Sequence, residues 1–403
     1  MKRSMFCCNA TKGLGIAAAW FAAAMLLSAA VSASPRRPDS DDVVLERLSP
    51  AIVALRQLRR TAAMPAAASL TQALANARHY IEIGQTYSDP RAYGYAQAAL
   101  GTWWTADPAP ARLLVMRARI LQFRHEFDAA LAQLEPALKS DQFDPDAWLL
   151  FAGIEQVRGN VRAARAACLK LIPITDPLVG ATCAASTAAL IGRTQEAEQL
   201  LAHALTQPTG SSAAEQTWAW TTLAELRVRH LDAAAAEDAF RQALALTHDD
   251  VYARAAYADF LLDENRPRDV CNLLGNDGGQ ADVTLLRAAI AAQRNGDANA
   301  AALRETLAQR FAEARQRGDR THLREQARFA LEVEHDVARA LELAQQNFIV
   351  QREPADARVL LDSALAAGKP QAAQPALDWL RETGIDAPRL QSLAQRARTG
   401  AQE

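Results

Sequence analysis

The sequence has few of the signals that mark β-structure. Alternating runs of β-branched residues and Asn-Gly turns, which are typical of strands and hairpins, are nearly absent from the 403 residues. Aromatic residues make up only 6% of the chain, whereas 50% of it is hydrophobic, and much of that is alanine. Because small side chains let helix axes approach closely, this composition predicts an all-α fold.

Signatures of catalysis and metal binding are missing as well. The chain contains no Gly-x-Ser-x-Gly elbow, no Cys-x-x-Cys and no His-Glu-x-x-His. Its histidine–acid neighbours, such as His125-Glu126, fall at expected turns, where polar residues are needed regardless of function. We therefore predict a protein that is not an enzyme and that has no catalytic residue, no bound metal and no cofactor.

A strong basic charge is also absent. Removing the three basic residues of the segment 1–33 from the total of 44 leaves 41, against 46 acidic residues, for a net charge of −5. Nucleic acids and anionic lipids both require a basic surface. The mature chain is therefore not expected to bind nucleic acid or an anionic membrane as its main partner.

The first 33 residues have the features of a secretory signal peptide. Three basic residues lie near the start of this segment and an uncharged apolar run follows them. Val31-Ser32-Ala33 then fits the small-x-small pattern of a cleavage site. The alternative is an uncleaved membrane anchor, because the apolar run is nearly long enough to span a bilayer. We favour cleavage, and we predict export to a bacterial periplasm with no membrane insertion of the mature chain.

Few cysteines would remain after cleavage. Cys168, Cys183 and Cys271 are an odd number, which excludes a fully paired disulfide framework. Cys168 and Cys183 lie in neighbouring helices that are expected to pack together, so a disulfide between them is compatible with an oxidising compartment. The alternative, which we favour, is three small buried thiols in an alanine-rich core.

One pattern occurs twice at a spacing of 34 residues in the range 111–177. Large apolar residues recur at the spacing of a helix face, and small residues recur where two helices must approach. The aligned positions are Leu114, Ala118, Leu121, Phe127, Ala130, Leu134 and Ala137 in the first copy, and Trp148, Ala152, Glu155, Val161, Ala164, Cys168 and Leu171 in the second. Their period and order resemble the tetratricopeptide repeat, a helix–turn–helix module. Four residues stand at or next to its consensus positions: Trp148, Ala152, Ala164 and Pro177.

The resemblance implies a right-handed α-superhelix of about nine repeats with capping helices. The repeats are expected to start near Ala77, Ala111, Pro145, Leu178, Thr217, Val251, Asp282, Thr321 and Pro354. The last three are degenerate, and Arg328 stands where a small residue is expected. The domains predicted are a signal peptide at 1–33, a linker with capping helices at 34–76, the repeats at 77–386, and a C-terminal helix and tail at 387–403.

A partner is expected to bind the concave groove of such a superhelix. The second, fifth, ninth and twelfth positions of each first helix share one face, and in the family that this chain resembles that face lines the groove. Trp218 and Tyr252, above Glu225 and Asp259, suit a peptide with a basic residue; the alternative is that Trp218 only packs against the turn-rich insertion at 207–212. The candidate partner-binding residues are Trp218, Thr221, Glu225, Tyr252, Asp259, Arg112 and Arg119.

These observations favour a non-catalytic periplasmic scaffold that binds a protein or peptide partner. One alternative is a structural subunit of a cell-envelope or polysaccharide-export assembly. Another is a degenerate relative of the lytic transglycosylases, some of which contain an α-superhelix. The sequence leaves no residue span for the separate catalytic domain that those enzymes carry.

Overall fold

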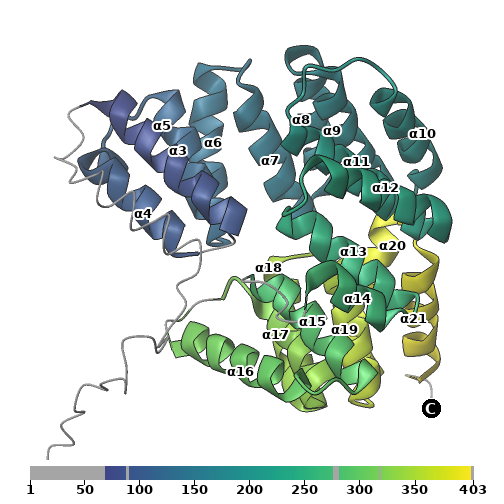
Figure 1. Ribbon diagram of the computed structural model, residues 1–403. Coiled ribbons are helices and arrows are strands. Elements are labelled where there is room, and N and C mark those ends of the chain that lie inside the picture. Colours follow the sequence, from purple (N-terminus) through teal and green to yellow (C-terminus); the bar gives the residue numbers. More distant parts are fainter. Residues whose placement is uncertain (1–68, 88–89, 276–280, 317, 319, 401–403) are drawn as a thin grey trace, which may run out of the picture. The chain divides into compact units, whose positions relative to one another are not determined.

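The computed structural model describes residues 69–87, 90–275, 281–316, 318 and 320–400, and every regular element within these ranges is a helix (Figure 1). The predicted signal peptide, the segment 34–68 and most of the glycine-rich stretch at 275–279 lie outside the described residues. The chain divides into two units, 1–48 and 49–403, and the second unit holds every described residue.

The helices follow one another in antiparallel pairs joined by short turns. The first helices of the pairs are α3 (Leu70–Tyr87), α5 (Ala111–Phe123), α7 (Pro145–Val157), α9 (Pro177–Ala189), α11 (Ala213–Arg229), α13 (Val251–Asp263), α15 (Asp282–Asn295), α17 (Leu323–Phe329) and α19 (Pro354–Ala366). The second helices are α4 (Arg91–Leu100), α6 (Phe127–Ser140), α8 (Val161–Leu171), α10 (Thr194–Leu205), α12 (Ala233–Leu246), α14 (Pro267–Leu274), α16 (Ala300–Gln316), α18 (Val337–Val350) and α20 (Gln374–Thr383), and α21 (Pro388–Gly400) follows them. Short elements are η1 (Gly101–Thr105), η2 (Ile172–Ile174), η3 (Ala330–Glu334) and η4 (Pro370–Ala373).

Several first helices begin at the residue that the repeat spacing predicted, namely Ala111, Pro145, Val251, Asp282 and Pro354. Side-chain caps account for two of these starts, those at Pro145 and Val251. Asp144 accepts a hydrogen bond from the backbone N–H of Ala147 at 3.0 Å, and Asp250 accepts one from Ala253 at 2.8 Å. The lengthened second helix predicted at 301–317 is also present as α16, and Gly318 after it has a positive φ of 69°.

The first pair differs from the prediction. Helix α3 begins at Leu70 rather than near Ala77, so residues 70–76 belong to the first repeat and not to a separate cap. The reason is that Ala73, Leu74 and Ala77 continue a single buried stripe along the helix.

Paired helices approach each other at a small residue, the eighth position of the repeat. At this position Ala118, Ala152, Ala185, Ala224, Ala258 and Ala289 are all at most 3% exposed. Gly84 stands there in the first repeat, and a Cβ atom on it would lie 2.8 Å from the ring of Tyr93 in α4. The alanine content of the sequence is thus explained by close helix packing.

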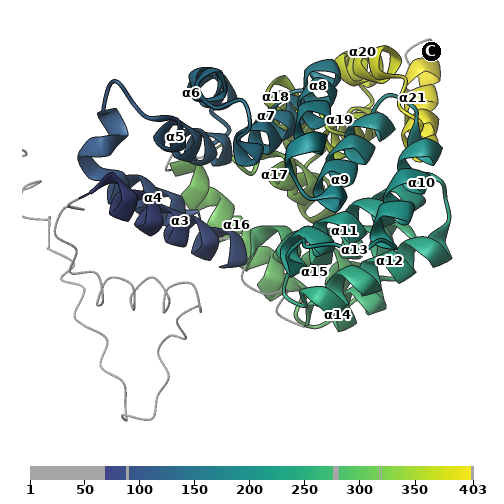
Figure 2. The same ribbon diagram turned by 90° about the horizontal axis from the view of Figure 1, so that it is seen from above.

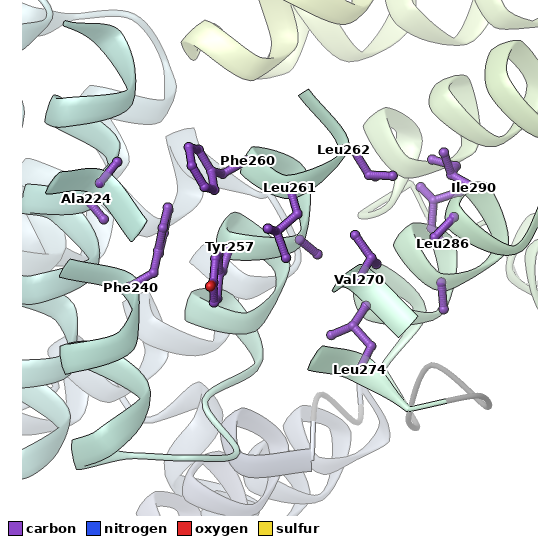
Figure 3. Close-up of a cluster of buried hydrophobic side chains, with 14 of the residues drawn as sticks. Ala224, Phe240, Tyr257, Phe260, Leu261, Leu262, Val270, Leu274, Leu286 and Ile290 are labelled. Carbon is purple, nitrogen blue, oxygen red and sulfur yellow. The ribbon is translucent and has the colours of Figure 1, made fainter. Parts of the chain in front are cut away.

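Among the described residues, the largest cluster of buried side chains runs from Leu178 in α9 to Val333 in η3, and Figure 3 shows part of it. At its centre the rings of Phe240 in α12 and Tyr257 in α13 stack, with centroids 5.1 Å apart. Phe260 adds a second ring from α13, 5.8 Å from Phe240. Such contacts between consecutive pairs make each repeat dependent on its neighbours.

The C-terminal helices also contact helices far earlier in the sequence (Figures 1 and 2). The backbone N–H of Arg352 donates to the carbonyl of Val157 at 2.7 Å. A Cβ atom on Gly192 would lie 2.5 Å from the carbonyl oxygen of Gly384, which shows how closely these two turns approach. Val161 and Leu190 are buried in the same apolar cluster as Trp379 and other C-terminal residues. The end of the chain therefore packs against α7 to α10.

The cysteines correct one expectation. Cys168 of α8 and Cys183 of α9 form a disulfide and are not free buried thiols, while Cys271 is unpaired. The pairing follows from packing, because the second helix of one repeat lies against the first helix of the next. The bond closes a loop with a sequence separation of 15 residues, for which the chain-entropy estimate of stabilisation is about 3 kcal/mol.

The small-residue contact gives the first testable prediction. Replacing Ala152, which is 3% exposed, with Leu should overpack the α7–α8 contact and lower the free energy of unfolding by about 1–3 kcal/mol. Ala132 lies on the exposed side of α6, so Ala132→Leu should have a much smaller effect. Urea titrations of both variants measure the difference, and equal losses would mean that the repeat register is wrong.

Candidate partner-binding site

Side chains from four first helices converge around Tyr252. Helix α11 contributes Glu225 and Arg229, α13 contributes Tyr252, and Arg324 of α17 and Glu353 at the N-cap of α19 act on Tyr252 electrostatically. We call these five residues the Tyr252 cluster. The structure thus brings together two residues that the sequence placed on one face, Glu225 and Tyr252, with three that it did not single out.

Tyr252 combines an exposed ring with a fixed hydroxyl. Tyr252 is 59% exposed, and its hydroxyl donates a hydrogen bond to Oε1 of Glu225 at 2.8 Å. The charge of Glu225 raises the pKa of Tyr252 well above its ordinary value. The phenol therefore stays protonated, and the hydrogen bond holds the ring in place.

Carboxylates outnumber the cations beside Arg324. The guanidinium of this residue lies 3.4 Å from each of three carboxylates, those of Glu325, Glu353 and Asp356. Burial opposes its charge, but these acids outweigh burial and raise the pKa of Arg324 well above its ordinary value. Glu325 also pairs with Arg287 at 3.9 Å, and these two cations lower its pKa to about 2 in spite of burial. The carboxylates left undercompensated by the sharing of Arg324 are therefore those of Glu353 and Asp356, whose pKa values burial raises.

The acids of the Tyr252 cluster show the effect of this sharing. Burial, and then the charge of Asp356, raise the pKa of Glu353 to about 7. Burial also raises the pKa of Glu225, although Arg229 and the Tyr252 hydroxyl favour its charged form. Nη1 of Arg229 is buried without a hydrogen-bond partner. The cluster therefore holds both undercompensated carboxylates and an unused donor.

Asp259 and Thr221 have their polar groups engaged within the protein. Asp259 accepts hydrogen bonds from Arg287 and Arg328, each at 2.7 Å, and these two cations lower its pKa in spite of burial. Thr221 is 1% exposed and donates to the carbonyl of Thr217 in its own helix at 2.8 Å. Thr221 thus presents no surface to a partner, because its neighbours in α11 and the adjacent helices cover it.

The remaining candidate residues lie in other surroundings. Trp218 is half-buried and packs against the apolar cluster that contains Val179 and the Cys168–Cys183 disulfide. It therefore differs from Tyr252 although both stand at the second position of their repeats. On α5, Arg112 is exposed, and Arg119 pairs with Asp146 of α7 at 3.3 Å.

Two of the residues that sequence reasoning missed did leave a signal. Arg324 and Arg328 stand at the fourth and eighth positions of the repeat from Thr321, which normally pack against the second helix. Charged residues at these positions made the repeat look degenerate. In the structure they reach acids of other repeats, so the departure from the pattern marks the site. Glu353 gave no such signal, because an acid before Pro354 is an ordinary helix N-cap.

The described residues contain no group of three or more His, Cys, Asp or Glu side chains placed to hold a metal ion. Among the helices of these same residues, none is both long and apolar enough to cross a membrane.

The helix pairs and their repeated small-residue contacts define an all-α, tetratricopeptide-like helical-repeat fold. No protein-family model and no curated protein sequence matches the chain. Among solved structures, the Rap protein complexed with competence and sporulation factor aligns with 86% of this chain and 93% of its own, at 12% identity and a TM-score of 0.47. The Cut9–Hcn1 hetero-tetramer of APC/C aligns with 87% and 86%, at 12% identity and a TM-score of 0.39. The human IFIT1 dimer with PPP-AAAA aligns with 83% and 86%, at 12% identity and a TM-score of 0.40.

Glu353 gives a prediction about pH. Its folded-state pKa of about 7 exceeds the ordinary 4.5, so its contribution to stability is fully present below the lower value and is lost as the pH rises through the higher one. From about pH 5 to about pH 8, wild type should therefore lose about 1–3 kcal/mol relative to Glu353→Gln. Thermal unfolding across this range measures the difference, with Glu382→Gln as an exposed-acid control; parallel curves for wild type and Glu353→Gln would contradict the assignment.

Proposed function

We propose that this protein is an exported, non-catalytic scaffold that binds a peptide segment with a basic residue at the Tyr252 cluster. The observation that carries the proposal is the geometry of Tyr252, an aromatic ring that is 59% exposed and held by a hydrogen bond to Glu225. A ring that is fixed before binding loses little conformational entropy when a partner covers it. Rigid aromatic residues of this kind are the commonest anchors of protein interfaces.

The charges around the ring favour a cationic ligand group. Burial raises the pKa values of Glu225 and Glu353, and the neighbouring arginines do not offset it. A guanidinium or ammonium group beside them would restore their ionised form and would also face the π-electrons of Tyr252. The unpaired Nη1 of Arg229 offers a hydrogen bond to a backbone carbonyl of the same segment. A peptide supplies both groups.

Export is supported by the leading sequence and by the cysteines. The segment 1–33 has the charge, the apolar run and the small-x-small site of a cleaved signal peptide. The Cys168–Cys183 disulfide fits an oxidising compartment such as the periplasm, since cytosolic thiols are kept reduced. Both features concern the compartment and are independent of the binding site.

Export is tested by expressing the whole chain in a bacterium with a periplasm. We expect a protein that is released with the periplasmic fraction, begins at or near Ser34 by intact mass, and has Cys168 and Cys183 oxidised. Retention of Met1 in a membrane fraction would show that the leading segment is an anchor and is not cleaved.

Binding is tested by comparing two exposed aromatic residues. A partner is first captured from periplasmic extract with the wild-type protein and is then titrated against purified variants. Tyr252→Ala should weaken its binding by about 2 kcal/mol, or roughly 30-fold, as expected for an anchor. Phe143→Ala is the matched control, because Phe143 is 66% exposed in the turn between α6 and α7.

The comparison shows whether the partner binds at the Tyr252 cluster or elsewhere. If the partner binds Tyr252→Ala as tightly as wild type, the Tyr252 cluster is not the site. Trp218→Ala would not test binding alone. Trp218 packs against the cluster around Val179, so its loss should also lower the stability of the protein.

A further inference from the structure

The C-terminal repeats place three arginines on the same helix that carries Tyr252. These arginines come from separate helices: Arg328 from α17, Arg358 from α19 and Arg389 from α21. Their partners are Asp259, Asp263 and Glu264 in the last turns of α13 and just after it, which we call the α13 carboxylates. The pairs join residues 69, 95 and 125 positions apart in the sequence.

The geometry at Asp263 is that of a guanidinium-binding site. Arg358 donates through Nη1 and Nη2 to the two carboxylate oxygens of Asp263, both at 2.7 Å. Nη1 of Arg389 lies 2.9 Å from the same carboxylate, and its Nη2 donates to Glu264. Two-point contact of this kind is the strongest and most directional way in which a carboxylate binds arginine.

The α13 carboxylates lie along the helix from Tyr252. Residues 252, 259 and 263 are seven and four positions apart, a spacing that places them on one side of a helix. A peptide that anchors on the ring and continues along α13 would meet these carboxylates next. In the structure they are already occupied by arginines of the protein itself.

We propose that Arg358 and Arg389 act as an internal competitor, which occupies Asp263 and Glu264 of the α13 carboxylates in place of the arginine side chains of a basic partner. This inference rests on the proposed function, since it concerns the ligand of that same surface. A protein in which the competitor is bound most of the time binds its partner with an affinity reduced by the fraction that is open. The competitor thereby selects partners that carry several basic residues over those with one.

Exposure makes such an exchange feasible. The side chains of Arg358 and Arg389 are 45% and 40% exposed, whereas that of Asp263, which both arginines contact, is 15% exposed. An incoming guanidinium can therefore replace the arginines from their solvent side, while the apolar contacts of Val161 and Leu190 hold the helices in place. Arg328 is less suited to exchange, because it is only 15% exposed.

The test measures the affinity of the full mature chain for a short fluorescein-labelled peptide of alternating arginine and glycine. The variant with Arg358→Gln and Arg389→Gln should bind it about fivefold or more tightly than wild type. The matched control has Arg339→Gln and Arg381→Gln, which remove the same charge but break only pairs within single helices, with Glu342 and Asp378. Circular dichroism confirms that each variant is folded.

A third variant adds Asp263→Asn to the pair of changes at Arg358 and Arg389. It should lose the gain in affinity, which assigns the released site to this carboxylate. The proposal is overturned if both double variants gain equally, or if wild type already binds as tightly as the Arg358/Arg389 variant. In the second case peptide binding, and with it the proposed function, still stands. If no variant binds the peptide, the proposed function and the competitor both fail.

Discussion

Close approach of paired helices at one small residue is the contact on which this structure depends. Wherever glycine or alanine occupies the eighth position of a repeat, as at Gly84, Ala118 and Ala152, the second helix packs directly against the first. Arg328 breaks the rule, and its side chain extends to Asp259 in another repeat. One charged contact between distant repeats therefore arises where the packing constraint is relaxed, and the candidate site lies beside this position.

The sequence was informative about whatever depends on neighbours in the chain. Helix type, the starts at Ala111, Pro145 and Val251, and the long helix before Gly318 all follow from local periodicity, capping and turn residues. Helix α3 starts earlier than the consensus positions predict, because the apolar stripe continues through Leu70 and Ala73. The disulfide does not follow from the sequence, since spacing alone cannot tell a bonded pair from two buried thiols.

Only the part of the candidate site that comes from adjacent repeats can be predicted from the sequence. Glu225 and Tyr252 stand at matching positions of adjacent repeats, so the repeat period alone placed them on one face. Arg324, Glu353 and Arg358 reach this region from later repeats, and nothing in a repeat pattern states which distant helices meet. Asp259 illustrates this limit: its position in the repeat can be read from the sequence, but the two arginines that bind it cannot be foreseen from one helix.

The backbone hydrogen bond from Arg352 to Val157 has a consequence for how the chain folds. An open array of repeats folds by nearest-neighbour growth and can fray from either end. Here the last helices rest on α7 to α10, so the end of the chain cannot unravel without breaking contacts made in its middle. Contacts between residues so far apart in sequence raise the contact order and slow folding. They also link the last repeats to those of α7 to α10, so that a destabilising change at the C-terminal end should also affect the middle of the array.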